Sequence, residues 1–172
     1  MLIIIFYCFR QLRRKKIIQE YIYVNKSYLK EYRPRVSVIV PVYNEEVIIR
    51  RTIKALLKSD YPLSEILIID DGSTDQTASI INKYFSHNSK VKLQQKENGG
   101  KASALNLGFQ NALGDIIITI DADTIFKPAT ISDLVKNFSD SRVAAVTGNC
   151  KIGNLHNQLL LWQHIEYVTA QN

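Results

Sequence analysis

The chain has 172 residues, enough for one domain, and its 46% hydrophobic content excludes a disordered or fibrous protein. The net charge of +6 is uneven: residues 1–35 hold nine basic and two acidic residues, and the remainder is nearly neutral. Because the body lacks interleaved basic and aromatic residues, this distribution argues against nucleic-acid binding and favours an anionic membrane surface.

The N-terminal residues 1–9 are wholly apolar (MLIIIFYCF) and precede the basic stretch RQLRRKK. A spanning helix needs about 20 apolar residues, so this run is too short, and charges that follow the run exclude a signal peptide. A short interfacial helix fits, but we favour the end of a transmembrane helix with the basic cluster on the cytosolic side. Residues 1–35 are therefore expected to be a membrane-proximal helix and linker.

From residue 36 onward, strand and helix patterns alternate. Strands are expected at 36–40, 65–70, 91–95, 115–121 and 142–148, and helices at 45–58, 76–85, 101–113, 128–138 and 155–172. Ser73 and Gln76 have capping-box spacing. The helix at 101–113 is expected to bury the face formed by Ala102, Leu105, Phe109 and Ala112.

This alternation predicts an α/β fold with a mostly parallel sheet, in which every strand ends at the same edge. Ligands of such sheets bind beyond that edge. Four polar clusters follow the strands: PVYNEE (41–46), DDGSTD (70–75), NGGK (98–101) and DAD (121–123). Each alone fits a turn or a helix cap, but carboxylates gathered without a partner repel one another, so we expect them to bind a ligand.

The clusters suit a nucleoside diphosphate. Asp121 and Asp123 can face one hard cation, which prefers oxygen ligands. Asp71 and the backbone at 41–43 can hydrogen-bond a base edge, Tyr43 can pack against its face, and Lys101 can offset negative charge. A Walker A loop is excluded because its first glycine is absent and Ala102 occupies the Ser/Thr position. No G-x-G-x-x-G follows the first strand, which argues against a dinucleotide.

The segments VSVIVPVYNEE, IIDDGSTD, NGGKASALNLG and ITIDADT resemble, in order and spacing, the family 2 glycosyltransferases over residues 36–172. VTGNCKIGN and LLLWQHIEYVTAQN are similar to the membrane β-glycan synthases and N-acetylglucosaminyltransferases of that family, such as the chitin-oligosaccharide and poly-N-acetylglucosamine synthases. ITIDADT also resembles the strand of dehalogenase-type phosphatases, but there the acidic pair should lie downstream, and here it lies upstream.

The resemblance implies a GT-A fold: a Rossmann-like, mostly parallel sheet with helices on both faces, here truncated at its C-terminal side. It also implies that residues 36–172 are the nucleotide-sugar-binding part of that domain. By the same resemblance, Pro41, Tyr43 and Glu45 line a uridine pocket, Asp71 binds the uracil and Lys101 lies near the nucleotide.

In the family, D-x-D residues hold a divalent ion. The resemblance therefore assigns Asp123 to Mg²⁺ or Mn²⁺ and places Asp121 nearer the ribose or diphosphate. It implies inverting transfer of a sugar, N-acetylglucosamine in this subgroup, from a UDP-sugar to a glycan or lipid acceptor at the cell membrane.

The sequence departs from the family in one respect. The E-D or T-E-D segment with the catalytic base and the Q-x-x-R-W motif are not found before Asn172. We therefore expect no catalytic residue in this chain, a base beyond Asn172, and no turnover by this chain alone. A lipid-phosphate glycosyltransferase and a catalytically incomplete nucleotide-binding fragment are the alternatives.

Overall fold

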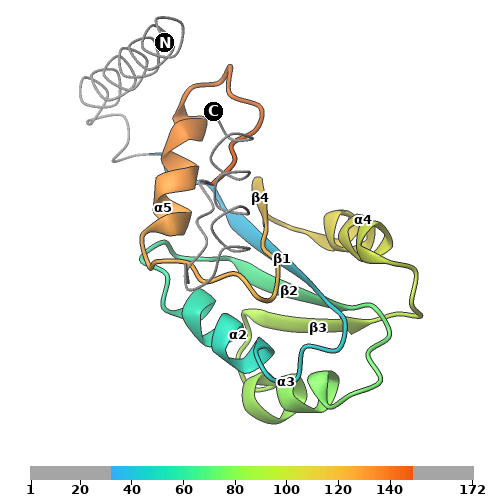
Figure 1. Ribbon diagram of the computed structural model, residues 1–172. Coiled ribbons are helices and arrows are strands. Elements are labelled where there is room, and N and C mark those ends of the chain that lie inside the picture. The colour runs from blue at the N-terminus through green and yellow to red at the C-terminus, as the bar shows by residue number, and fades with distance from the viewer. Residues whose placement is uncertain (1–31, 149–172) are drawn as a thin grey trace, which may run out of the picture.

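The computed structural model describes residues 32–148, which form a four-stranded parallel sheet with helices on both faces (Figure 1). The strand order is β3-β2-β1-β4. The elements are β1 (Val36–Val42), α2 (Ile49–Leu57), β2 (Glu65–Asp70), α3 (Thr77–Phe85), β3 (Val91–Gln95), α4 (Lys101–Asn111), β4 (Ile116–Thr119), α5 (Thr130–Val135) and the 3₁₀ helix η2 (Lys136–Ser139).

The register of the sheet follows from its two central strands, which are buried along almost their whole length. β1 pairs with β2 from Ser37–Glu65 to Val42–Asp70 and with β4 from Val36–Ile116 to Ile39–Thr119. All pairings are parallel, so the strands end at one edge. The runs VSVIV and EILIID are continuous apolar stretches because helices cover both of their faces.

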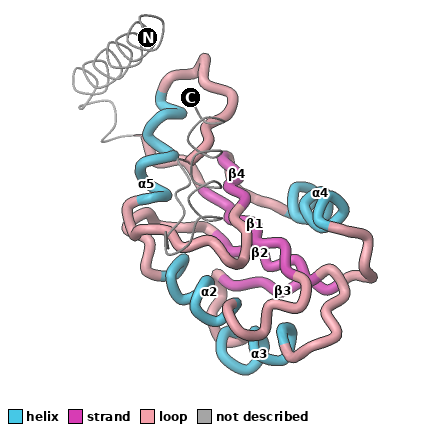
Figure 2. The backbone as a smooth tube through the Cα atoms, in the orientation of Figure 1, coloured by secondary structure: helices cyan, strands magenta, loops and turns pink. Residues whose placement is uncertain are grey.

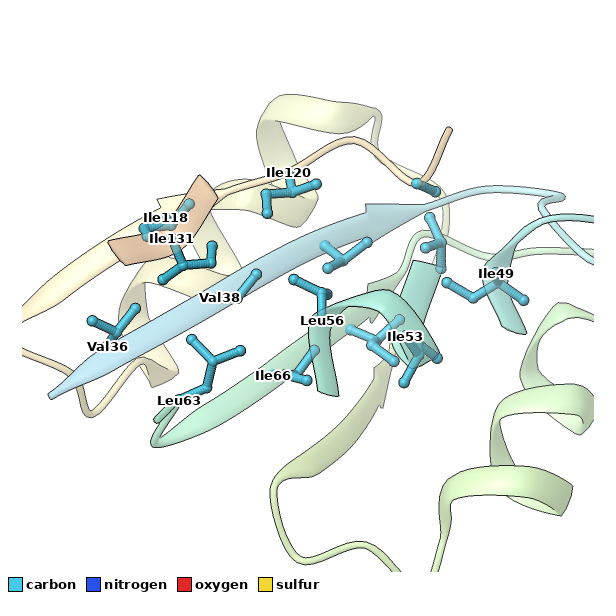
Figure 3. Packing of buried hydrophobic residues seen from close by; sticks show 14 of the residues in the cluster. Val36, Val38, Ile49, Ile53, Leu56, Leu63, Ile66, Ile118, Ile120 and Ile131 are labelled. Carbon is cyan, nitrogen blue, oxygen red and sulfur yellow. The ribbon is translucent and has the colours of Figure 1, made fainter. Parts of the chain in front are cut away.

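Alternate residues of β1 and β2 enter two separate hydrophobic clusters. On one face, α2, α3 and α5 pack over the even-numbered positions such as Val38 and Ile66. Figure 3 shows Ile53 and Leu56 of α2 lying over this face. On the other face, Ile39 and the odd positions of β2 pack against α4, which Figure 2 shows on its own side of the strands.

Four expected strands and four expected helices are confirmed. β2 and β3 have the expected bounds, and the other six elements differ at one or both ends. α2 begins at Ile49 instead of residue 45. In the preceding turn, the backbone N–H groups of Glu45 and Glu46 donate to the side chains of Thr77, the first residue of α3, and Asp75, in the loop before it. The helix expected at 128–138 is divided into α5 and η2. The helix expected at 155–172 and the segment before residue 32 lie outside the described residues.

The strand expected at 142–148 is wrong: Val143–Gly148 has no regular secondary structure. The expectation rested on the run VAAV. A strand also needs a neighbour for its backbone hydrogen bonds, and within residues 32–148 no strand pairs with this segment.

Of the helices in the same range, none is both long and apolar enough to cross a bilayer.

The capping box expected at Ser73 and Gln76 is also absent. The side chain of Ser73 accepts a hydrogen bond from Asn44 N (2.9 Å) instead. The backbone N–H of Gln76 donates to Glu46 Oε2 (2.9 Å), and the backbone N–H of Thr77 donates to Asp75 Oδ1 (2.9 Å). The start of α3 is therefore satisfied partly by a residue 30 positions earlier in the chain.

Candidate functional site

A pocket of about 280 Å³ opens beyond the carboxyl ends of the strands. The end of β1, the loops that follow β1, β2 and β4, and the first turn of α4 form its walls. Its lining residues are Pro41, Val42, Tyr43, Glu45, Asp71, Lys101, Ala104, Asp121, Ala122 and Asp123. The edge of the sheet predicted from the alternation of strands and helices is thus the edge that carries the pocket.

The loop after β1 is joined to the loop after β2 by a row of hydrogen bonds. Asn44 N donates to Ser73 Oγ (2.9 Å), and Thr74 N donates back to Asn44 Oδ1 (2.8 Å). Asn44 has φ 55°, a left-handed conformation that few side chains adopt and that asparagine tolerates. This turn leaves the adjacent Tyr43 ring at the pocket, with the residue 50% exposed.

Asp71 lies in the wall of the pocket, and its side chain is only 5% exposed. Its Oδ1 accepts hydrogen bonds from Lys96 Nζ (2.6 Å) and Gly99 N (3.0 Å), and its Oδ2 accepts one from Gly100 N (2.7 Å). Burial pushes the pKa of Asp71 upward, but these donors outweigh it and the pKa is lowered. The carboxylate therefore stays charged, and Oδ2 accepts a single internal donor.

Lys101 and Asp121 meet across the pocket. Lys101 is the first residue of α4, and its Nζ lies 2.6 Å from Asp121 Oδ1. Both side chains are more than half exposed, so the ion pair is weak and can open when another charged group enters.

The D-A-D segment is held by its central residue. Ala122 is buried, and its carbonyl accepts a hydrogen bond from Thr52 Oγ1 of α2 (2.5 Å). Asp121 and Asp123 on either side are exposed. Burying Ala122 therefore leaves both neighbouring carboxylates at the pocket.

Negative charge accumulates on this side of the pocket. The pKa of Glu45 is raised by burial and then by repulsion from Asp123 and Asp75. The repulsion among these carboxylates, which is the smaller cause of the raised pKa, is relieved by an added positive charge, and oxygen ligands suit a hard divalent cation. Within residues 32–148, no three His, Cys, Asp or Glu side chains are already gathered at metal-binding distance.

The structure brings together all seven residues selected from the sequence: Pro41, Tyr43, Glu45, Asp71, Lys101, Asp121 and Asp123. Val42 and Ala122 lie within the selected clusters, but the sequence reasoning missed Ala104, which completes the apolar lining. It also missed Lys96, the ionic partner of Asp71. The available signal for Lys96 was its position directly after β3, next to the N-G-G-K cluster.

A family model described as glycosyl transferase family 2 matches residues 37–170. The chain is 38% identical over 135 residues to the poly-beta-1,6-N-acetyl-D-glucosamine synthase of Staphylococcus aureus (strain COL). The alignment covers 78% of this chain and 33% of that protein. The chain thus spans about a third of the length of this curated relative.

Solved glycosyltransferases share the fold. A mannosyltransferase from Pyrobaculum calidifontis in complex with GDP-Man and Mn²⁺ matches with a TM-score of 0.60 and 33% identity, over 71% of this chain and 40% of that one. S. aureus TarS in complex with UDP-GlcNAc matches with a TM-score of 0.53 and 35% identity, over 58% of this chain and 29% of that one. These neighbours confirm the Rossmann-like GT-A fold class.

Proposed function

The chain belongs to glycosyl transferase family 2, and we propose that it forms the donor-binding part of an inverting transferase that adds N-acetylglucosamine from a UDP-sugar to a growing polysaccharide. The observation that carries this proposal is the pocket beyond the parallel strands, where an exposed tyrosine, a lysine and a row of carboxylates converge. The choice of sugar and of a glycan acceptor rests on the similarity to the poly-beta-1,6-N-acetyl-D-glucosamine synthase.

In this proposal the uridine lies against the wall formed by Pro41, Tyr43 and Glu45. Tyr43 is half exposed, so its ring can stack on a base without displacing core residues. Asp71 supplies the remaining acceptor position of Oδ2 to the uracil N–H, since a carboxylate has room for about four hydrogen bonds. Lys101, when it releases Asp121, offers its charge to the diphosphate.

We propose that Asp123, with Asp121 nearby, holds Mg²⁺ or Mn²⁺. Three properties fit a cation. The side chains of Asp121 and Asp123 are exposed at the pocket, and their ligand atoms are carboxylate oxygens. Asp123 also contributes to the repulsion that raises the pKa of Glu45. The ion, when bound, neutralises charge that develops on the leaving diphosphate. Thr52 maintains this arrangement by its hydrogen bond to the carbonyl of Ala122.

We also propose that residues 36–172 constitute the sugar-nucleotide unit and that residues 1–35 place it at the cytosolic face of a membrane. The support is the net +7 of that leader and its apolar start. Anionic lipids attract such clusters by roughly 1 kcal/mol per basic residue near the surface. Arg35, the last residue of the leader, is joined to the domain through its backbone: its N–H donates to Asp115 Oδ2 (2.9 Å), and its carbonyl accepts a hydrogen bond from Asp115 N (2.8 Å).

Calorimetric titration of the full chain with UDP, with and without Mn²⁺, tests the proposal. We expect UDP to bind and Mn²⁺ to strengthen binding about tenfold or more, because the ion bridges two sets of negative charge. Asp123→Asn should remove the Mn²⁺ effect. Asp133→Asn, which alters an exposed acid of α5 paired with Lys136, should leave it intact.

Two results would count against specific parts of the proposal. A wild-type chain that does not bind UDP under either condition contradicts the donor-binding role. A wild-type chain that binds UDP equally with and without Mn²⁺, or an Asp123→Asn variant that keeps the Mn²⁺ effect, contradicts the metal role.

A further inference from the structure

Lys96 lies directly after β3, outside every motif that resembles a nucleotide site. Its side chain is only 19% exposed, which is unusual for a lysine. The ammonium group is 2.6 Å from Asp71 Oδ1 and also donates to the carbonyl of Glu97. One lysine thus connects the loop after β2 to the loop that leads into α4.

Asp71 transmits this connection to the start of α4. Its two oxygens accept the amides of Gly99 and Gly100, the last two residues before the helix. Gly100 precedes Lys101 with φ 84°, a conformation that disfavours a side chain. The carboxylate therefore fixes the turn that sets the direction of the first residue of α4.

The loop before α4 packs closely against its neighbours. A Cβ on Gly99 would lie 2.9 Å from Lys96 Nζ, and a Cβ on Gly72 would lie 2.8 Å from the backbone N of Asn98. The Lys96 head group thus lies directly against Gly99, and a side chain at position 99 would have to displace it. Beyond the turn, Lys101 reaches Asp121 at 2.6 Å on the far side of the pocket.

We infer that Lys96 is a positioning residue for donor binding: it holds the Asp71 carboxylate, which orders the Gly99–Gly100 turn and directs Lys101 into the pocket. This inference rests on the proposed function, because Lys101 is taken to act on the diphosphate of the donor. Lys96 itself does not line the pocket. It acts through Asp71, whose remaining acceptor position is kept aimed at the base.

A second lysine of the same strand region provides a matched comparison. Lys92 on β3 pairs with Glu65 (2.8 Å), another buried carboxylate that also accepts a backbone amide, from Leu113 (2.7 Å). Glu65 lies at the opposite, amino-terminal end of β2, away from the pocket lining. Loss of either lysine leaves a buried carboxylate without its cation, but only Lys96 serves the turn before α4.

The experiment compares Lys96→Met, Lys96→Arg and Lys92→Met in the full chain. UDP affinity is measured by calorimetry with Mn²⁺, folding by circular dichroism, and hydrogen exchange at the amides of Gly99 and Gly100 by NMR. Lys96→Met should raise the Kd for UDP about tenfold and speed exchange at Gly100, because charge-assisted hydrogen bonds are the strong ones. Lys96→Arg should restore both, and Lys92→Met should change neither.

The outcomes separate this inference from the proposed function. Wild-type UDP binding with an unchanged Kd in folded Lys96→Met overturns the inference alone, and so does an equal loss in Lys92→Met. Absence of UDP binding by the wild-type chain overturns the proposed function, and the exchange rate at Gly100 then decides whether Lys96 orders the turn. If Lys96→Met does not fold, Lys96→Gln takes its place and must lose more UDP affinity than Lys92→Met.

Discussion

Buried carboxylates in this protein organise backbone turns. Glu65 accepts Ser37 Oγ (2.6 Å), Lys92 and the amide of Leu113, and Asp71 accepts Lys96 and two glycine amides. A buried charge is costly unless it is paired and hydrogen-bonded. Each carboxylate is therefore placed where several donors from distant segments converge, and each fixes the position of those segments.

Asn44 is the residue whose backbone and side chain are both under constraint. Its left-handed conformation and its Oδ1 contact with Thr74 N each depend on asparagine. We expect Asn44→Ala to lower the free energy of unfolding by about 2 kcal/mol, since it adds backbone strain and removes an acceptor. Urea denaturation measures the change.

Asn44→Gly separates the two contributions. Glycine adopts positive φ freely but lacks the acceptor, so this variant should lose less stability than Asn44→Ala. If the two variants are equally stable, backbone strain at this position plays no part. A match between Asn44→Ala and the wild type would contradict the whole account of the loop.

α4 joins the site to the core because it approaches the sheet unusually closely. Ala104 and Gly108 are its buried residues, and they face Ile39 and the odd-numbered residues of β2. A Cβ on Gly108 would lie 2.6 Å from Ile39 Cγ2, within a hard contact. The helix can lie this close only because position 108 has no side chain, and its first residue, Lys101, is at the pocket as a result.

We expect Gly108→Ala to destabilise the protein by about 1–3 kcal/mol, because overpacking at Ile39 exceeds the gain of up to about 1 kcal/mol in helix propensity. The variant should also weaken UDP binding by displacing Lys101. Gln110→Ala, at an exposed position of the same helix, should change stability by less than about 0.5 kcal/mol. Thermal unfolding compares the stability of the two variants. A Gly108→Ala variant more stable than the wild type would show that α4 and Ile39 can accommodate a Cβ at position 108.

The protein as a whole depends on ionised acids. The pKa values of Glu65, Asp71 and Asp75 are lowered. Burial alone would raise each pKa, but hydrogen bonds outweigh it. The main donors are Lys92 to Glu65, Lys96 to Asp71 and Thr77 to Asp75. A lowered folded pKa adds stability above the unfolded value of about 4 and loses it as the pH falls through the folded value. Glu45, with a raised pKa, has the opposite effect.

Among the described residues, five carboxylates have a lowered pKa, these three together with Asp115 and Asp140, and only Glu45 has a raised one. We therefore expect the free energy of unfolding to decrease as the pH falls from about 5 to about 2. Urea titrations at about pH 7, 5 and 3 measure this decrease, and urea leaves the ionic contacts unscreened. Glu65→Gln should flatten the dependence. A free energy of unfolding that is constant or higher at the acidic end would contradict the assignment of these groups.

Local patterns were sufficient for the four strands of the sheet and for seven of the residues that line the pocket. Continuous apolar runs mark β1 and β2 because helices cover both faces, and the parallel order places the loops at 41–46, 70–75 and 121–123 at one edge. Tyr43, Asp71, Lys101 and Asp123 were identified from these rules alone. Their convergence is a consequence of strand direction, which the alternation of strands and helices makes predictable.

Contacts between distant segments decided the rest. The buried face of α4 centres on Ala104 and Gly108, because close approach to Ile39 favours the smallest residues. Of the face that the pattern indicated, Leu105 and Ala112 pack against this cluster, but Ala102 and Phe109 are exposed. The start of α3 is bonded to Glu46, and Asp71 is bonded to Lys96, pairs separated by 30 and 25 residues. Periodicity depends only on residues close together along the chain. It therefore cannot predict hydrogen-bond partners that only folding brings together.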